Sequence, residues 1–342
     1  MTALRIGLNG AGRIGRALLR LLADREDAEI VAINDTAGPG TVAHLLRHDS
    51  VHGPFPGPVE AGKDRITVRG REIRFHAEPD PGSIPWDEDR VELVIEATGK
   101  FAAGSAARRH LGGPVRRVVV TAVAPEADAM VVPGVTPAVP GPDASMICLG
   151  SCTTHAAALP LALLDRWYGI EAAEMTTVHC TTGSQVTMDQ PHRDPRRARS
   201  ALLSMIPTTT SASRGLVTVL PALAGRLTCL AIRVPVAAGS LVEIVAATRE
   251  RVDPPEGLAD RFRAAAEGEL AGLLGVSDEP LVSIDFVGNP CSSVVDLPLL
   301  ARPGERLVRV IAWYDNEWGY ANRVRDVVLA HRDDTAWKGV AP

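Results

Sequence analysis

The stretch "LRIGLNGAGRIGRALLRLLAD", residues 4–24, joins a short apolar run to a helical pattern through a glycine-rich turn. The run has the length of a buried strand, and the apolar residues after the turn recur at the spacing of one helix face. Gly10, Gly12 and Gly15 form G-x-G-x-x-G between the two. The first glycine of this motif permits a tight turn, the second admits a pyrophosphate, and the third allows the helix to pack closely on the strand. The stretch therefore predicts a dinucleotide-binding unit.

An acidic residue at the right distance supports this interpretation. The run "EIVAIND" (29–35) predicts a second strand, and it ends at Asp35, twenty residues past Gly15. A carboxylate there binds the adenosine ribose of a dinucleotide. It favours NAD, because it repels a 2′-phosphate. The small residues Thr36 and Ala37 leave room for a phosphate, so NADP use stays open.

The pattern of elements changes near residue 150. Before it, nearly continuous β-branched runs at 91–99 and 116–123 are typical of parallel strands covered on both faces, and 53–62 is predicted to be a loop. After it, long strands predominate, which indicates an α+β domain with a mainly antiparallel sheet. The predicted strands there are 173–182, 227–236, 240–250, 280–288 and 306–316, and the predicted helices are 153–167, 256–273 and 320–331. We predict an α/β protein with domains at 1–150 and 151–317 and a C-terminal helix (318–342) that completes the first domain.

Composition excludes several classes of protein. The 342 residues carry a net charge of −5, which gives no general attraction to nucleic acid or to anionic membranes. Five cysteines without a C-x-x-C pair argue against a disulfide framework and against a zinc site, and they favour a reducing compartment. The chain shows no signal-peptide pattern and no apolar run of membrane-spanning length. We expect a cytoplasmic protein without a metal, a nucleic-acid partner or a membrane partner.

Cys152 lies just before the predicted helix 153–167, with Ser151 as its predicted N-cap. A helix N-terminus favours the thiolate form of cysteine. A free cysteine is nevertheless more often a small buried hydrophobe, and a nucleophile needs a base within reach. His179, on the predicted strand 173–182, is a candidate base, but the spacing alone does not establish the pair.

Two further features indicate anion binding, and each has a plainer alternative. The hydroxyl-rich stretch 204–215 has the composition of a loop that cradles an anion. Arg233 lies in an apolar strand and needs a partner, either a ligand phosphate or a protein carboxylate. The basic stretch 192–200 lacks interleaved aromatic residues, so it is more typical of a solvated face or a subunit contact than of a nucleic-acid site.

Taken in order, several motifs make the chain similar to phosphorylating glyceraldehyde-3-phosphate dehydrogenases over nearly its whole length. These motifs are "GLNGAGRIGR", "SCTTH", "TTVH", "HRDPRRARSALLSMIPTTT", "RVPV", "LVSIDF" and "WYDNEWGYANRV". The resemblance implies a Rossmann NAD-binding domain, a catalytic domain and a homotetramer. It also implies an oxidoreductase of glycolysis that converts glyceraldehyde 3-phosphate, phosphate and NAD to 1,3-bisphosphoglycerate and NADH through a cysteine thioester.

The resemblance also assigns residues. Cys152 would be the nucleophile and His179 its base. The cofactor contacts would be Gly10, Gly12, Arg13, Ile14, Gly15, Asp35, Asn316 and Tyr320. The contacts of the substrate phosphate and the attacking phosphate would be Ser151, Thr153, Thr182, Thr210, Ser211 and Arg233. The basic stretch 192–199 would border the cofactor at a subunit interface.

Departures from the family pattern keep other functions open. His155, Gly183, Ser184 and Ser211 replace an asparagine, an asparagine, an aspartate and a glycine near the chemistry, while Leu149 and Ala11 replace an asparagine and a phenylalanine. The same mechanism could therefore act on erythrose 4-phosphate or on a phosphonate-type aldehyde. Semialdehyde or acyl-phosphate reductases are a more distant alternative, because they lack "WYDNEWGY". A non-enzymatic alternative is a dinucleotide-binding redox sensor that uses Cys152 as an oxidisable thiol.

Overall fold

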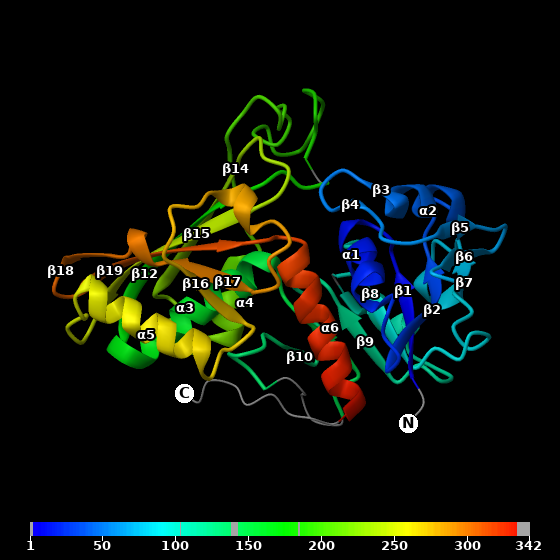
Figure 1. Cartoon of the computed structure of the whole chain (residues 1–342), viewed down its shortest axis with the longest axis horizontal. Coiled ribbons are helices and arrows are strands. Elements are labelled where there is room, and N and C mark those ends of the chain that lie inside the picture. The colour runs from blue at the N-terminus through cyan, green and yellow to red at the C-terminus, as the bar shows by residue number, and fades with distance from the viewer. Residues whose placement is uncertain (1–2, 103, 138–142, 184, 334–342) are drawn as a thin grey trace. The chain divides into compact units, whose positions relative to one another are not determined.

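The computed structural model describes residues 3–333 apart from residues 103, 138–142 and 184. Within this part, the chain divides into two compact units, each with its own β-sheet (Figure 1). Unit 1 comprises the described residues of 3–131, 143–150 and 321–333, and unit 2 comprises those of 132–137 and 151–320.

Unit 1 is built on a nine-stranded sheet of the Rossmann type. Its strands, in spatial order, are β10 (Ala129–Met130), β11 (Met146–Cys148), β9 (Arg117–Val120), β8 (Leu93–Glu96), β1 (Leu4–Asn9), β2 (Ala28–Asn34), β7 (Arg71–His76), β6 (Arg65–Val68) and β5 (Val59–Ala61). The strands from β10 to β7 run parallel, and β6 and β5 add an antiparallel edge. The carboxyl ends of β1, β2 and β8 therefore meet at one edge, where ligands of such sheets bind.

The predicted helix after β1 is confirmed as α1 (Arg13–Leu22), whose apolar face is buried. The expected loop at 53–62 is wrong in part, because it contains β5 and the short strand β4 (Gly53–Pro54), which pairs with β3 (His48–Asp49). The sequence also gave no prediction of α2 (Pro39–Arg47), β6 or β7, nor of the 3₁₀ turns η1 (Pro81–Ser83) and η2 (Gly104–His110). These elements are short, and a short element carries few periods of its hydrophobic pattern.

Unit 2 contains an eight-stranded, mainly antiparallel sheet, as predicted. The strands, in spatial order, are β13 (Ile206–Thr208), β14 (Leu227–Arg233), β12 (Ile170–His179), β15 (Ser240–Thr248), β19 (Leu307–Tyr314), β17 (Ser293–Asp296) and β16 (Leu274–Ser277), with β18 (Ala301–Gly304) paired to β19. Two neighbouring pairs, β12 with β14 and β16 with β17, are parallel.

The predicted strand at 280–288 is wrong. This segment contains the 3₁₀ turn η4 (Ser283–Phe286), closed by the Asp285 carboxylate, which accepts a hydrogen bond from Val282 N at 2.9 Å. Val282 and Ile284 are 58% and 67% exposed. The apolar alternation was therefore not a sign of a buried strand, and the neighbouring places in the sheet are taken by β16 and β17.

The helices of unit 2 include the one on which Cys152 lies. α3 (Cys152–Tyr168) packs on the sheet through β12, β15, β17 and β19. The other helices are α4 (Ala212–Val219), α5 (Pro255–Glu267), α6 (Trp318–Asp333), which continues into unit 1, and the 3₁₀ turns η3 (Pro221–Leu223) and η5 (Leu297–Leu299). The stretch 204–215, expected as a loop, instead contains β13 and the start of α4. In the described part of the chain, no helix is long and apolar enough to cross a membrane.

Candidate active site

The turn between β1 and α1 shows why each of its glycines is needed. Gly10 has a positive φ of 97°, which disfavours any residue with a side chain. A Cβ on Gly15 would lie 2.2 Å from Gly10 O, so the helix reaches the strand only with glycine at this position. No atom lies within 4 Å of the place where a Cβ on Gly12 would be. The backbone at Gly12 is therefore open to a ligand.

A hollow of about 200 Å³ lies at this turn, at the carboxyl ends of β1, β2 and β8. Residues that line it include Gly10, Gly12, Asp35, Thr36 and Thr98. The two oxygens of Asp35 accept hydrogen bonds from Ala11 N and Ala37 N, each at 2.8 Å. Each oxygen keeps a lone pair for a ribose hydroxyl. The open backbone, the hollow and this carboxylate fit a dinucleotide.

The other predicted cofactor contacts lie in two places. Arg13 and Ile14 form the first turn of α1, beside the hollow's glycines, and both are partly exposed. Asn316 and Tyr320 belong to unit 2. Asn316 Oδ1 accepts a hydrogen bond from Gly239 N at 3.3 Å, and Tyr320 is buried against another ring.

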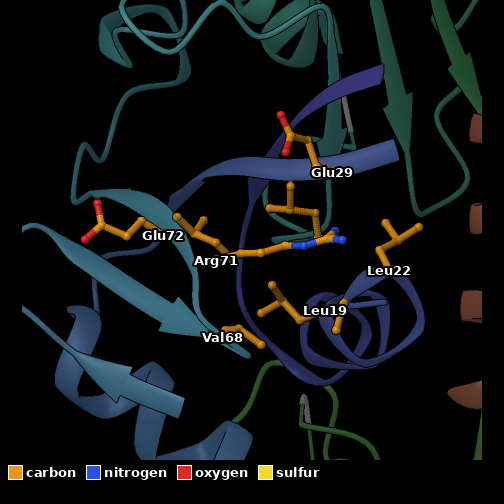
Figure 2. A pocket seen from close by; sticks show the side chains of 9 residues that line it. Leu19, Leu22, Glu29, Val68, Arg71 and Glu72 are labelled. Carbon is orange, nitrogen blue, oxygen red and sulfur yellow. The ribbon is translucent and has the colours of Figure 1, made fainter. Parts of the chain in front are cut away.

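A second hollow in unit 1 is much smaller. Figure 2 shows it between Leu19 and Leu22 of α1 and Val68 at the end of β6, with Arg71 extended across it. Its volume is about 30 Å³, room for a water molecule rather than for a nucleotide. It is therefore not a cofactor site.

The sheet of unit 2 places His179 and Arg233 side by side. They are register partners at the last positions of the parallel strands β12 and β14. Cys152, the first residue of α3, has its Sγ 3.5 Å from His179 Nε2. Three residues separated by up to 81 positions in the chain thus form one cluster of a thiol, an imidazole and a guanidinium.

The Cys180 carbonyl oxygen orients the imidazole. It lies 2.8 Å from His179 Nδ1 and also accepts a hydrogen bond from Arg233 Nη1 at 3.2 Å. Arg233 Nη1, which only donates, lies against the same nitrogen, so the contacts of Nδ1 include one donor and one acceptor. The other ring nitrogen, Nε2, faces the Cys152 thiol.

The environment of Arg233 makes it available to an anion. Burial lowers the pKa of Arg233 from its ordinary value, and the negative charge of a Cys152 thiolate partly offsets this effect. Among the described residues, no carboxylate forms an ion pair with Arg233. The positive charge of Arg197 lowers the pKa of Arg233 further, and Arg197 Nε donates to Thr208 Oγ1 at 2.9 Å. Arg197 was not predicted as a site residue, although it lies in the basic stretch 192–200.

Tyr314 packs against the other side of this cluster. Its hydroxyl lies 2.9 Å from Thr153 Oγ1 and 3.0 Å from Thr177 Oγ1, and its ring meets the His179 ring edge-on. Burial raises the pKa of Tyr314 far above its usual range, so it stays a neutral phenol. Thr153, predicted to contact phosphate, is buried and turns its hydroxyl to Tyr314.

The other predicted phosphate contacts lie at turns and helix ends. Ser151 is the predicted N-cap of α3, and this is confirmed, because Ser151 Oγ accepts from Thr154 N at 3.1 Å. Thr182 begins a turn closed by Gln185, whose side chain accepts from Thr182 N at 3.1 Å. Thr210 Oγ1 accepts from Ala212 N at 3.1 Å, and Ser211 is exposed before α4.

The remaining cysteines differ from Cys152 in their surroundings. All five are free thiols. Burial raises the pKa of the Cys148 thiol, and it raises that of Cys229 to about 11. A thiol is nucleophilic only as its thiolate, so Cys148 and Cys229 are inert near neutral pH.

The residues that depart from the family pattern are also placed. His155 is buried in α3 and packs edge-on against Tyr320, with ring centroids 5.4 Å apart. Leu149 and Ala11 are buried, and Gly183 has open space where a Cβ would lie. Ser184 falls outside the described residues.

The fold and these two sites define a class of protein. It has a dinucleotide-binding Rossmann unit and an α+β unit with a cysteine beside a histidine and an arginine, the constellation of an activated thiol nucleophile. Comparison with known families narrows this class. The family domain described as "Glyceraldehyde 3-phosphate dehydrogenase, NAD binding domain" matches residues 4–104, and the one described as "Glyceraldehyde 3-phosphate dehydrogenase, C-terminal domain" matches residues 151–316.

Individual relatives agree over almost the whole chain. A glyceraldehyde-3-phosphate dehydrogenase of Kitasatospora aureofaciens is 46% identical over 95% of this chain and 98% of its own. Glyceraldehyde-3-phosphate dehydrogenase 1 of Bacillus cereus is 44% identical (94% and 97%), and the enzyme of Geobacillus stearothermophilus is 42% identical (95% and 97%). The chain belongs to the glyceraldehyde-3-phosphate dehydrogenase family, and its N-terminal unit is the NAD-binding domain of that family.

Proposed function

We propose that this protein oxidises glyceraldehyde 3-phosphate to an acyl phosphate, with NAD and inorganic phosphate as co-substrates and Cys152 as the nucleophile. The observation that carries the proposal is the 3.5 Å contact between Cys152 Sγ and His179 Nε2, with Arg233 beside the imidazole. The names and near-complete coverage of the relatives support the choice of substrate.

In the proposed reaction, the Cys152 thiolate attacks the aldehyde carbon and forms a carbon–sulfur bond. The aldehyde oxygen takes up the proton that His179 Nε2 received from the thiol, and Nε2 removes this proton again as a hydride leaves the same carbon, which gives the thioester. The glycine turn and Asp35 would hold NAD in the hollow of unit 1, and NAD would supply the acceptor of that hydride. Inorganic phosphate then attacks the thioester carbon, and the Cys152 thiolate leaves.

The anions of this reaction need cationic and hydroxyl groups. Arg233, without a carboxylate partner among the described residues, is suited to bind the substrate phosphate or the attacking phosphate. We propose Thr182 as a second contact of the substrate phosphate, and Ser151, Thr153, Thr210 and Ser211 as contacts of the attacking phosphate. Thr153 would have to turn its hydroxyl away from Tyr314 to take part.

Other features of the family remain predictions for this chain. Among these are the homotetramer, the cytoplasmic location and the use of NADP beside NAD. The Asp35 carboxylate supports a preference for NAD, because it would repel a 2′-phosphate at the rim of the hollow.

A spectrophotometric assay at 340 nm tests the proposed function. The assay compares glyceraldehyde 3-phosphate with erythrose 4-phosphate, each with NAD and with NADP, in the presence and absence of phosphate. We expect the highest kcat/KM with glyceraldehyde 3-phosphate and NAD, and dependence on phosphate. If neither aldehyde reduces either cofactor, the substrate assignment is wrong.

The Cys152→Ser variant tests the mechanism. A serine hydroxyl is a far weaker nucleophile than a thiolate, so we expect turnover to fall at least about a thousandfold. NAD affinity, measured by calorimetry, should stay within about twofold of the wild type, because Cys152 is not among the predicted contacts of the cofactor. Full activity of this variant would exclude the thioester route.

A further inference from the structure

A buried polar cluster in unit 1 takes no part in the proposed chemistry. Glu96, the last residue of β8, and His110, the last residue of η2, are 1% and 3% exposed. Glu96 Oε2 lies 3.1 Å from His110 Nε2. A buried carboxylate is costly unless several donors satisfy it, so the neighbours of this pair decide what it does.

Trp86 fixes the proton on His110. Trp86 Nε1 is only a donor, and it lies 3.1 Å from His110 Nδ1, so Nδ1 accepts. His110 Nε2 therefore carries the proton and donates a hydrogen bond to Glu96. The Trp86 ring packs directly against Gly7 of β1, where a Cβ would lie only 2.9 Å from it.

The Glu96 carboxylate gathers three more donors. Asn9 Nδ2 donates to Oε2 at 2.5 Å, and Thr98 N donates to Oε1 at 2.9 Å. The hydroxyl of Thr98 also donates to Oε1, and it accepts from Lys100 N at 3.0 Å. Four donors from three segments of the chain thus converge on one buried carboxylate.

Two of the residues that donate to Glu96, Asn9 and Thr98, also line the dinucleotide hollow. Asn9 Oδ1 accepts from Asn34 Nδ2 at 2.8 Å, and Asn34 Oδ1 accepts from Glu78 N at 2.8 Å. Asn9, Asn34, Glu78 and Thr98 all line the hollow, whereas His110 and Trp86 do not. The cluster therefore joins the carboxyl ends of β1, β2 and β8 beneath the hollow.

The glycine turn depends on the backbone of the same residues. Gly10 N donates to Asn34 O at 2.8 Å, and Ala97 N donates to Asn9 O at 2.7 Å. A Cβ on Gly10 would lie 2.8 Å from Thr98 N, so the turn is in close contact with the segment that Glu96 holds. A shift of Thr98 or Asn9 would therefore change the surface offered to a pyrophosphate.

We infer that Glu96 and His110 are positioning residues for the dinucleotide: they hold Asn9, Asn34 and Thr98 in the arrangement that binds NAD. They act through these residues and do not touch the cofactor themselves. The inference rests on NAD binding by unit 1 and on no step of the aldehyde chemistry.

Calorimetric titration with NAD tests this inference on Glu96→Gln and His110→Gln. An amide at position 96 offers one acceptor oxygen in place of two. The side-chain amide that His110→Gln introduces differs in shape from the imidazole, so it cannot reproduce the geometry in which one ring accepts from Trp86 and donates to Glu96. We expect Kd for NAD to rise about tenfold in each, as for the loss of one charge-assisted hydrogen bond. The rate of Cys152 alkylation without NAD should not change.

A matched pair in the same unit provides the control. His76 Nε2 lies 2.6 Å from Asp89 Oδ2, its ring also packs against Trp86, and neither residue lines the hollow. We expect His76→Gln and Asp89→Asn to change Kd for NAD by less than about twofold. Equal losses in control and test variants would mean a general effect of destabilisation and would overturn the inference.

A milder variant covers the case in which Glu96→Gln does not fold. Trp86→Phe removes the donor to His110 Nδ1 but keeps a ring in the core, and we expect Kd for NAD to rise about threefold. Wild-type affinity in all folded variants of the cluster would overturn the inference. Because the readout is binding of NAD alone, this result is independent of whether glyceraldehyde 3-phosphate is the substrate.

Discussion

The Cys180 carbonyl oxygen contacts both His179, the predicted base, and Arg233. Cys180 is itself held in place by Ser240. Ser240, the buried first residue of β15, accepts a hydrogen bond from Cys180 N at 3.1 Å. The carbonyl oxygen of Cys180 in turn contacts His179 Nδ1 and accepts a hydrogen bond from Arg233. A hydroxyl outside the reacting groups thus orients the imidazole that faces Cys152.

We therefore expect Ser240→Ala to reduce the reactivity of Cys152. Without the anchor, the His179 ring is held less firmly beside the Cys152 thiol, so alkylation by iodoacetamide at neutral pH should slow about tenfold. The rate measured against pH should need a higher pH to reach its plateau. Ser240→Thr, which keeps a hydroxyl, should restore most of the rate.

The matched control is Ser293→Ala. Ser293 is the buried first residue of β17 in the same sheet, and its hydroxyl has no hydrogen-bond partner within the described chain. Its removal should leave alkylation unchanged. A pH profile of Ser240→Ala that coincides with the wild type would contradict the positioning role.

At the scale of elements, substitutions at two glycines of the β1–α1 turn distinguish effects on stability from effects on cofactor binding. A methyl group on Gly15 would collide with Gly10 O, whereas one on Gly12 would meet no protein atom. Gly15→Ala should therefore lower both the free energy of unfolding, by at least about 2 kcal/mol, and the affinity for NAD. Gly12→Ala should weaken NAD binding but change stability by less than about 0.5 kcal/mol. Urea unfolding and calorimetry measure the two quantities, and unchanged NAD affinity in Gly12→Ala would be against a pyrophosphate at this turn.

Near the end of α6, His331 makes a pH-dependent contact with Arg117 of β9. Burial and the nearby Arg117 lower the pKa of His331 to about 4. Arg117 donates to His331 Nδ1, which requires a neutral ring. In the unfolded chain the ring binds a proton near its ordinary pKa of 6.5, so its contribution to stability is lost as the pH falls from about 6.5 to about 4.

Urea unfolding at pH 7 and pH 4.5 measures this effect against His331→Gln. The wild type should lose about 2 kcal/mol more than the variant between the two values. Equal losses would show that His331 is not held neutral in the folded protein.

The secondary-structure elements differ in how well their sequences predict them. The strands at 4–10, 29–35, 91–99 and 116–123 were predictable because parallel strands covered on both faces are continuously apolar. The segment 280–288 has comparable apolar content but packs as an exposed turn. Whether such a segment pairs with a sheet depends on which other strands fill the neighbouring places.

At the scale of the whole molecule, unit 2 leaves large apolar side chains exposed. The most exposed in the described chain include Leu203, Met205, Met188 and Ile284. An interface between subunits is one way in which exposed apolar side chains become covered, as the homotetramer implied by the family resemblance would require. We expect light scattering after size exclusion to give about 145 kDa, four chains of 36.2 kDa. The double variant Leu203→Glu, Ile284→Glu should give smaller species, and a wild-type mass of one chain would refute the homotetramer.

The sequence by itself determined the dinucleotide unit, because a glycine turn and its acid lie within one short segment whose local geometry sets their roles. It also identified Cys152, His179 and Arg233 as candidates, and the resemblance to a known family gave each a role. Only the tertiary structure brought these three together, since the register of β12 with β14 and the start of α3 are set by pairing and packing over long separations. The same holds for Ser240 and for the Glu96–His110 cluster. Each of these depends on hydrogen bonds between residues far apart in the chain, and such contacts leave no periodic pattern in the sequence.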